Sequence, residues 1–328
     1  MDFNEPEVMF AAGVVEQASR LAQEVRAAMA AKDITKGDLS PVTVADFAVQ
    51  AVVGHALSMV FPEAVLVGEE SAAALRLPEN REVLELVTEF TSRYVPVTTE
   101  DLVCEWIDRG GDEPTTRFWT LDPIDGTKGY LRGGQYAIAL ALIEEGRVVL
   151  GALGCPALAG DCSPREGEGA VVVARRGEGA WARPLNDGGF SRIGVSPCTD
   201  PREARLLRSF EAGHTNVDQV DDIAAVLGAA GAAVGMDSQA KYAVLAAGGG
   251  ELLFRLLSPK RPDYKEMIWD QAAGSIVLEE AGGRITDLTG KPLDFGAGKT
   301  LAHNRGVFAS NGLLHEPGLS AIAQVCGL

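Results

Sequence analysis

Two carboxylates stand three residues apart in the segment LDPIDGT at 121–127. Pro123 restricts the backbone between Asp122 and Asp125, and Gly126 permits a sharp turn directly after them. Both carboxylates and a main-chain carbonyl can then converge on one hard cation, because such cations prefer oxygen ligands. The alternative is an ordinary turn, since Asp-Pro and Asp-Gly are common turn dipeptides.

Three further acidic positions have the same character. Glu69 and Glu70 directly follow a short apolar run, Asp270 lies in WDQAAG at 269–274, and Asp46 lies near the start of a predicted helix. Neighbouring strand residues point to opposite faces, so we expect at most one glutamate to be a direct ligand while the other orients its neighbours. A solvated turn or a helix-start carboxylate would explain each position alone. Their coincidence favours one shared cation site.

The elements that must position these side chains follow from periodicity and turn signals. We interpret the polar stretch 72–115 as an inserted surface segment with one helix, and we expect antiparallel hairpins before Pro197 and alternating strands and helices after it. The expected helices are 8–31, 44–60, 82–93, 217–230, 238–247 and 270–281, and the expected strands are 65–67, 118–121, 136–143, 147–153, 170–175, 179–185, 205–210 and 251–256. This pattern predicts two domains: an α+β metal-binding domain with an antiparallel sheet over 1–195, and an α/β domain over 196–328 that contributes Asp270.

Composition narrows the function. The chain has 328 residues, with 46 Asp and Glu against 29 Lys and Arg, for a net charge of −17. This charge opposes binding to a nucleic-acid polymer, which relies on basic residues. The five cysteines form no C-x-x-C pair, which predicts a reducing, cytoplasmic location without zinc or disulfides. We find no apolar run of about eighteen residues, and therefore expect no membrane partner. Oligomeric state is left open.

The motifs GEES at 68–71, LDPIDGT at 121–127 and WDQAAG at 269–274, in this order, resemble the inositol monophosphatase superfamily. The resemblance extends over almost the whole chain. It implies a layered α/β/α/β/α sandwich and a lithium-sensitive, magnesium-dependent enzyme. Members of this superfamily remove phosphate from small molecules by direct attack of a metal-activated water.

Within the superfamily, the sequence is most similar to the 3′(2′),5′-bisphosphate nucleotidases. SPVTVAD at 40–46, the long stretch between GEES and LDPIDGT, and EAGHTN at 211–216 followed by MDSQAKY at 236–242 carry this similarity. It implies hydrolysis of the 3′(2′)-phosphate of 3′-phosphoadenosine 5′-phosphate, which gives AMP. The alternatives are an inositol-phosphate or fructose-bisphosphate phosphatase and, in another class, a catalytically silent metal or nucleotide sensor.

The resemblance also assigns roles to residues. One Mg²⁺ would bind Glu69, Asp122 and the carbonyl of Ile124, a second would bind Asp122, Asp125 and Asp270, and a weaker third would lie near Glu69. The catalytic set would be Asp46, Thr127 and Glu70, with Asp46 and Thr127 holding and deprotonating the attacking water. The substrate would contact Gly126, His214, Asp237, Ser238, Lys241 and Arg255. Gln271 departs from the His often found at its position, which we expect to tune affinity only.

The residues themselves support this chemistry. A phosphate monoester dianion repels nucleophiles, so its hydrolysis needs positive charge, an activated water and a stabilised leaving group. Oxygen ligands without Cys or His suit Mg²⁺. Lys241 and Arg255 would meet the second phosphate, which explains how an acidic chain binds an anion. Lys241 follows Asp237 by four residues, and this spacing also fits a helix-surface ion pair.

Overall fold

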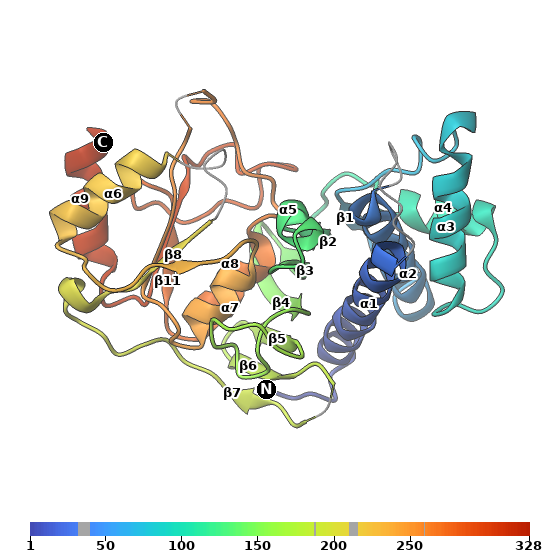
Figure 1. Cartoon of the computed structure of the whole chain (residues 1–328), viewed down its shortest axis with the longest axis horizontal. Helices are drawn as coiled ribbons and strands as arrows, with labels where there is room; N and C mark the ends of the chain where they lie inside the picture. Colours follow the sequence, from blue (N-terminus) through green and yellow to red (C-terminus); the bar gives the residue numbers. More distant parts are fainter. Residues whose placement is uncertain (32–39, 187, 210–215, 259) are drawn as a thin grey trace.

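The computed structural model describes residues 1–31, 40–186, 188–209, 216–258 and 260–328. Within these ranges the chain forms two β-sheets separated and flanked by helices (Figure 1). His214 and most of the segment 211–216 lie outside the described residues, so the structure says nothing of that prediction.

Among the described residues, the first sheet has seven strands in sequence order, from β1 to β7. Strands β1 and β2 are parallel, and all other neighbours are antiparallel. The strands are β1 (Leu66–Gly68), β2 (Arg117–Asp125), β3 (Ala137–Glu144), β4 (Arg147–Cys155), β5 (Ala170–Arg175), β6 (Gly179–Pro184) and β7 (Ser191–Arg192). Both predicted hairpins are present as β3–β4 and β5–β6.

In the part of the chain that the structure describes, the second sheet has five strands in the order β11-β12-β10-β8-β9. Strand β10 is parallel to β8 and antiparallel to β12, so this sheet is mixed. Its strands are β8 (Leu206–Arg208), β9 (Val234–Gly235), β10 (Leu252–Arg255), β11 (Arg284–Thr286) and β12 (Val307–Ser310).

The helices complete five layers, which Figure 1 shows side by side. α1 and α2 cover one face of the first sheet, α7 and α8 lie between the two sheets, and α6 and α9 cover the outer face of the second sheet. The predicted α/β/α/β/α sandwich is therefore confirmed. The helices are α1 (Pro6–Ala31), α2 (Pro41–Val60), α3 (Arg81–Ser92), α4 (Glu100–Asp108), α5 (Thr127–Leu131), α6 (Val217–Leu227), α7 (Ala240–Ala246), α8 (Ala272–Glu280) and α9 (His315–Cys326).

Both faces of the first sheet are buried, and the sequence of β3 shows how. Leu140 and Leu142 belong to the core under α1 and α2, whereas Ala139 and Ala141 belong to the core under α7 and α8. Side chains alternate between the two faces of a strand, so a strand buried on both sides reads as a continuous apolar run. Large residues on one face and small ones on the other allow α8 to pack closely on this sheet.

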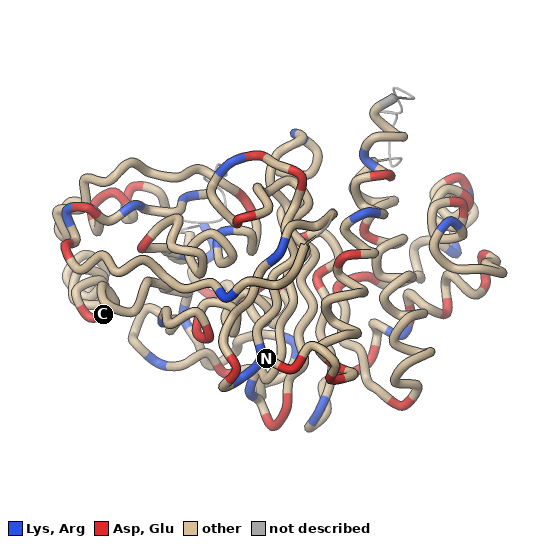
Figure 2. Tube along the Cα trace, turned by 90° about the horizontal axis from the view of Figure 1, so that it is seen from below, with Lys and Arg blue, Asp and Glu red and all other residues tan. Residues whose placement is uncertain are grey.

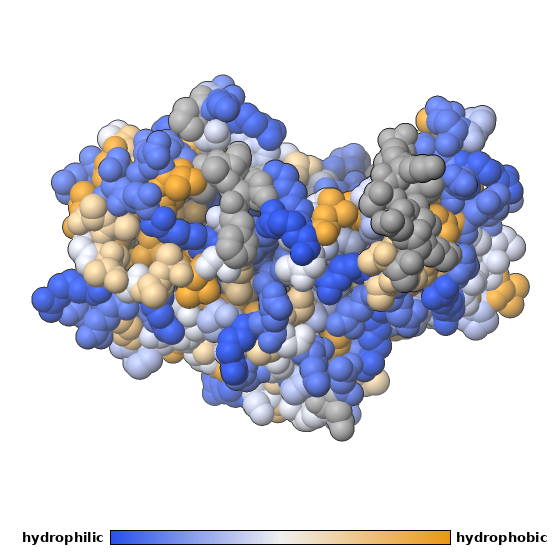
Figure 3. Space-filling view, viewed as in Figure 1, coloured by the Kyte–Doolittle hydropathy of each residue, from blue (hydrophilic) through white to orange (hydrophobic). Residues whose placement is uncertain are grey.

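Helix α2 is long and apolar enough to cross a membrane by length and composition, with a mean hydropathy of 1.4. This finding corrects the sequence prediction that no such run exists. However, 67% of the relevant stretch is buried inside the protein, as expected for a core helix. The face of the molecule in Figure 3 is mainly hydrophilic, with small separate hydrophobic patches.

The stretch 72–115 is more than an inserted surface segment. It forms α3 and α4, which pack against α2 and bury Val87, Phe90, Val103 and Ile107. Helix α4 was not predicted, because its nine residues mix apolar and acidic side chains too briefly for a clear helical period. Basic and acidic residues are interspersed along the whole described chain (Figure 2). The division into domains at residue 195 stays a prediction.

Candidate active site

The parallel pairing of β1 and β2 brings the first carboxylates together. Gly68 at the end of β1 pairs with Leu121 of β2, so Glu69 and Asp122 follow at the same edge of the sheet. The register between β2 and β3 shifts between Asp122 and Asp125. Residues three apart in a regular strand point to opposite faces, and a bulge removes this constraint. Asp122 and Asp125 can therefore face the same cavity.

That cavity has a volume of about 340 Å³ and lies where the strand edge meets segments from the C-terminal half. It gathers every predicted cation ligand and every described residue predicted to bind substrate. Its lining consists of Glu69, Asp122, Ile124, Asp125, Gly126, Thr127, Lys128, Gly129, Ser209, Asp237, Ser238, Lys241, Arg255, Tyr264 and Asp270. Residues up to 201 positions apart in sequence thus meet at one place, as the sequence predicted.

Nearby basic side chains offset only part of the negative charge that these carboxylates would carry if all were ionised. Burial raises the pKa of Asp122 well above its usual value, and the charges of Glu69, Asp125 and Asp270 raise it further. Burial also raises the pKa of Asp270 to about 8, and Arg255 opposes this rise only in part. Buried like charges disfavour ionisation, so these groups hold protons more tightly until a cation arrives.

The donor set fits a hard cation. All the predicted ligands are oxygen atoms, and Oδ1 of Asp122 is buried without any hydrogen-bond partner. A buried acceptor that lacks a partner is costly, and a cation would satisfy it. Across the described ranges no three His, Cys, Asp or Glu side chains already cluster as a formed metal site. The carboxylates instead line the cavity.

Asp46 and Glu70 lie beside this cavity but are not part of its lining. Asp46 is buried, and burial together with the charges of Glu70 and Glu69 raises its pKa well above the usual value. Burial and Glu69 raise the pKa of Glu70 to about 7. Among the described contacts no hydrogen bond joins Asp46 to Thr127, although catalytic hydrogen bonds often form only once substrate is bound.

A buried glutamine fixes the backbone of the Glu69-Glu70 pair. Gln50 accepts a hydrogen bond from the Glu70 N–H at 3.0 Å, and its Nε2 donates to the carbonyls of Glu70 at 2.6 Å and Ile107 at 2.8 Å. The absence of a side chain at Gly68 makes room, because a Cβ there would lie 2.6 Å from the Gln50 amide oxygen. Helix α2 thus orients the acidic pair through Gln50.

The two basic side chains Lys241 and Arg255 of the cavity lie on α7 and β10. The Lys241 amine is buried and donates to Ser209 Oγ at 3.1 Å. Burial lowers the pKa of Lys241 to about 8 despite the nearby Asp125. Asp237 forms an ion pair with Arg132, lies before the start of α7 and is buried like Lys241, which argues against a helix-surface pair of Asp237 with Lys241. Ser238 has a left-handed backbone, with φ at 66°.

Arg255 is held in place by a buried polar chain. It forms an ion pair with Glu266 at 2.6 Å, and Glu266 accepts from Gln271 Nε2 at 3.0 Å. The Tyr242 hydroxyl donates to Gln271 Oε1 at 2.5 Å. Gln271 is fully buried and does not line the cavity, so its side chain acts on the site through Glu266.

Several cavity residues were not predicted: Ser209, Lys128, Gly129 and Tyr264. Lys128 and Gly129 directly continue LDPIDGT, so their proximity could have been inferred. Gly129 also has a steric reason, because a Cβ there would lie 2.1 Å from the Gln135 carbonyl. Ser209 and Tyr264 carry no local signal, since only the packing of the second sheet brings them here.

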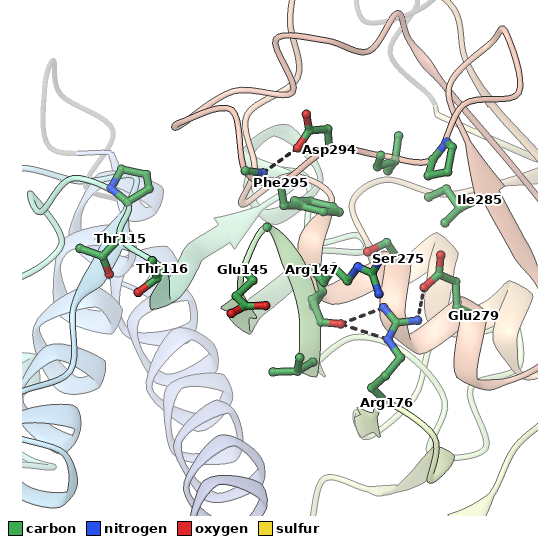
Figure 4. A pocket seen from close by; sticks show the side chains of 17 residues that line it. Thr115, Thr116, Glu145, Arg147, Arg176, Ser275, Glu279, Ile285, Asp294 and Phe295 are labelled. Carbon is green, nitrogen blue, oxygen red and sulfur yellow. Dashed lines mark hydrogen bonds and ion pairs between the residues drawn. The ribbon is translucent and has the colours of Figure 1, made fainter.

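A larger cavity of about 1250 Å³ lies elsewhere, beside the β3–β4 turn and α8 (Figure 4). Arg176 on its wall is already bound to the Val148 carbonyl and to Glu279. None of the predicted site residues lines this cavity. The smaller cavity is therefore the candidate active site, because it contains the predicted site residues.

A layered sandwich with carboxylates from two strand ends and a helix start, facing a buried lysine, defines a class of metal-dependent phosphatases. The family model of the inositol monophosphatase family matches residues 5–325. The chain belongs to this family, whose members depend on metal ions. This confirms the resemblance that the three sequence motifs indicated.

Two curated relatives match nearly the full chain. The 3′(2′),5′-bisphosphate nucleotidase of Emericella nidulans is 37% identical, with 96% of each chain covered. The 3′(2′),5′-bisphosphate nucleotidase of Schizosaccharomyces pombe is 39% identical, with 97% of this chain and 95% of the relative covered. Among solved structures, an inositol monophosphatase from Zymomonas mobilis aligns with a TM-score of 0.64 at 19% identity, over 98% of this chain and 99% of its own. That likeness supports the fold alone.

Proposed function

We propose that this protein is a Mg²⁺-dependent phosphatase that hydrolyses the 3′(2′)-phosphate of 3′(2′),5′-bisphosphate nucleotides, giving AMP from 3′-phosphoadenosine 5′-phosphate. One observation carries the proposal: a single cavity is lined both by clustered carboxylates and by the buried Lys241 with Arg255. This combination suits a substrate with two phosphates, one beside the cations and one beside the basic side chains. The names of the relatives at 37% and 39% identity support the same substrate.

The carboxylates that line the cavity would hold two or three cations. Glu69, Asp122 and the Ile124 carbonyl would bind one, Asp122, Asp125 and Asp270 a second, and Glu69 would face a weaker third. When bound, Mg²⁺ supplies positive charge that stabilises the phosphoryl oxygens and the leaving alkoxide and lowers the pKa of the attacking water. Li⁺ would inhibit by competing at the second position.

The remaining residues orient the reactants. Thr127 lies at the exposed mouth of the cavity, where its hydroxyl can orient a water, and Asp46 would accept the proton of that water. The negative charge of Glu70 would raise the pKa of Asp46 and so make Asp46 a stronger base. No step requires a covalent enzyme intermediate, because the water attacks phosphorus directly.

The remaining side chains of the cavity would bind the nucleotide. Lys241 and Arg255 would bind the second phosphate through charge-assisted hydrogen bonds. Gly126, Asp237 and Ser238 would contact the sugar and base, together with the predicted His214. The proposed location is cytoplasmic, on the cysteine pattern of the sequence.

The test is a phosphate-release panel with Mg²⁺. We expect hydrolysis of 3′-phosphoadenosine 5′-phosphate to be at least about tenfold faster than that of inositol 1-phosphate or fructose 1,6-bisphosphate. The reverse order would reject the proposal in favour of a sugar-phosphate or inositol-phosphate phosphatase. AMP binding without turnover of any phosphate ester would instead indicate a nucleotide sensor.

A further inference from the structure

Gln239 lies at the centre of the site without lining the cavity. The residue is 2% exposed and lies in the same short segment as Ser238 and Lys241, which both line the cavity. Its main-chain N–H donates to Oδ2 of Asp125 at 2.5 Å. The residue directly before α7 is thus joined to a predicted cation ligand from the first sheet.

The side chain of Gln239 reaches a second ligand-bearing segment. Its Nε2 donates to the carbonyl of Trp269 at 2.9 Å, and its Oε1 accepts from the N–H of Gly274 at 3.0 Å. Trp269 immediately precedes Asp270, and Gly274 lies in the first turn of α8. The amide therefore spans both ends of the loop that presents Asp270.

A buried glutamine needs hydrogen-bond partners, but it does not need partners that belong to two predicted cation-binding segments. One residue touches the carboxylate of Asp125 through its backbone and the frame of Asp270 through its side chain. Asp125 and Asp270 also come from different halves of the chain, and together with Asp122 they would share one cation. Groups behind direct ligands set their orientation and the affinity of the site.

We propose that Gln239 is a positioning residue that sets the distance between Asp125 and Asp270 and thereby the affinity of the cation site that they share. Because it directly follows Ser238 and lies two residues before Lys241, it also ties the loop that presents Asp270 to the segment that carries Lys241. This inference rests on the proposed function for the use of the site, but cation binding can be measured without any substrate.

The test variant is Gln239→Met, which keeps the length of the side chain and removes both amide hydrogen bonds. The main-chain bond to Asp125 remains. Gln23→Met is the matched control, because Gln23 Nε2 donates to the Pro156 carbonyl at 2.9 Å and lies outside the cavity lining. Mg²⁺ binding is measured by titration calorimetry on the full chain, together with thermal unfolding.

We expect Gln239→Met to weaken Mg²⁺ binding about tenfold, at the lower end of the usual effect of residues behind metal ligands. Gln23→Met should stay within about twofold of the parent protein. In turnover assays the Mg²⁺ concentration for half-maximal rate should rise, while kcat recovers at saturating Mg²⁺. If Gln239→Met does not fold, Gln239→Asn is the second variant. It keeps the amide group, but its side chain is one methylene shorter and cannot reach both Trp269 and Gly274, so we expect the same loss of Mg²⁺ affinity.

Unchanged Mg²⁺ affinity in a folded Gln239 variant would overturn the inference. A lowered kcat that high Mg²⁺ does not restore, with normal Mg²⁺ binding, would also overturn it. Failure to hydrolyse 3′-phosphoadenosine 5′-phosphate would reject the proposed function and leave this result standing.

Discussion

Mg²⁺ binding should weaken as the pH falls below about 8, because a cation must displace the proton that Asp270 holds. Burial raises the pKa of this carboxyl to about 8, and the charges of Glu266, Asp125 and Glu69 add to the rise. The group ionises above this pH, so affinity is present at high pH and lost as the pH falls through the pKa. A ligand must be deprotonated before it binds metal.

The magnitude follows from proton competition at one group. Relative to the fully ionised carboxyl, the apparent Mg²⁺ affinity is lower by a factor of about 2 at pH 8, about 11 at pH 7 and about 100 at pH 6. Lowering the pH from 8 to 7 therefore weakens Mg²⁺ binding about fivefold. At pH 7 the carboxyl is about nine-tenths protonated, so Mg²⁺ binding should release about one proton. The raised pKa of Asp122 acts in the same direction.

Calorimetry in two buffers with different heats of ionisation measures both quantities. We expect about one proton released per Mg²⁺ at pH 7 and little at pH 9. Asp270→Asn should remove most of this release while retaining AMP binding. Equal Mg²⁺ affinity at pH 7 and pH 8, without proton release, would refute the reasoning.

Other changes test separate parts of the structure. Lys241→Met should weaken AMP binding at least about tenfold in calorimetry, because a charge-assisted hydrogen bond is lost; an equal affinity would remove Lys241 from the nucleotide site. Gly126→Ala should lower the melting temperature and the activity more than the control Gly133→Ala, because both have positive φ but only the first Cβ would meet Ser238, at 2.8 Å; equal losses would exclude this crowding. His315 is buried and burial lowers its pKa to about 4, so protonation favours the unfolded chain and stability falls between pH 6.5 and 4. Urea unfolding should show a loss on the order of 2 kcal/mol at pH 5, which His315→Gln should reduce.

The sequence predicted most of the fold because its signals are local. The β3–β4 hairpin is an example: Glu145 and Gly146 both have positive φ, at 48° and 74°, and Gly after an acidic residue is a strong turn signal. The carboxylate motifs were equally local, since each follows a strand end or precedes a helix. Their meeting at one place was inferred from the coincidence of several acidic positions of the same character and from the family resemblance, because spacing along the chain does not show it.

Long-range packing explains what the sequence did not reveal. Gln50 and Gln239 look like ordinary helix residues, and only the assembled layers place their amides against Glu70 and Trp269. Tyr264 reaches the cavity from a loop of the second sheet in the same way. The packing of 72–115 against α2 was missed because its apolar residues are spaced among many charged ones.

Crystals grown with Mn²⁺ and AMP test the central claim most directly, because the anomalous signal of Mn²⁺ locates each bound ion. We predict at least two peaks inside the cavity, coordinated by oxygen atoms of Glu69, Asp122, Asp125 and Asp270, with AMP directed toward Lys241. A Mn²⁺-active enzyme whose anomalous map is empty among these four carboxylates would contradict the account.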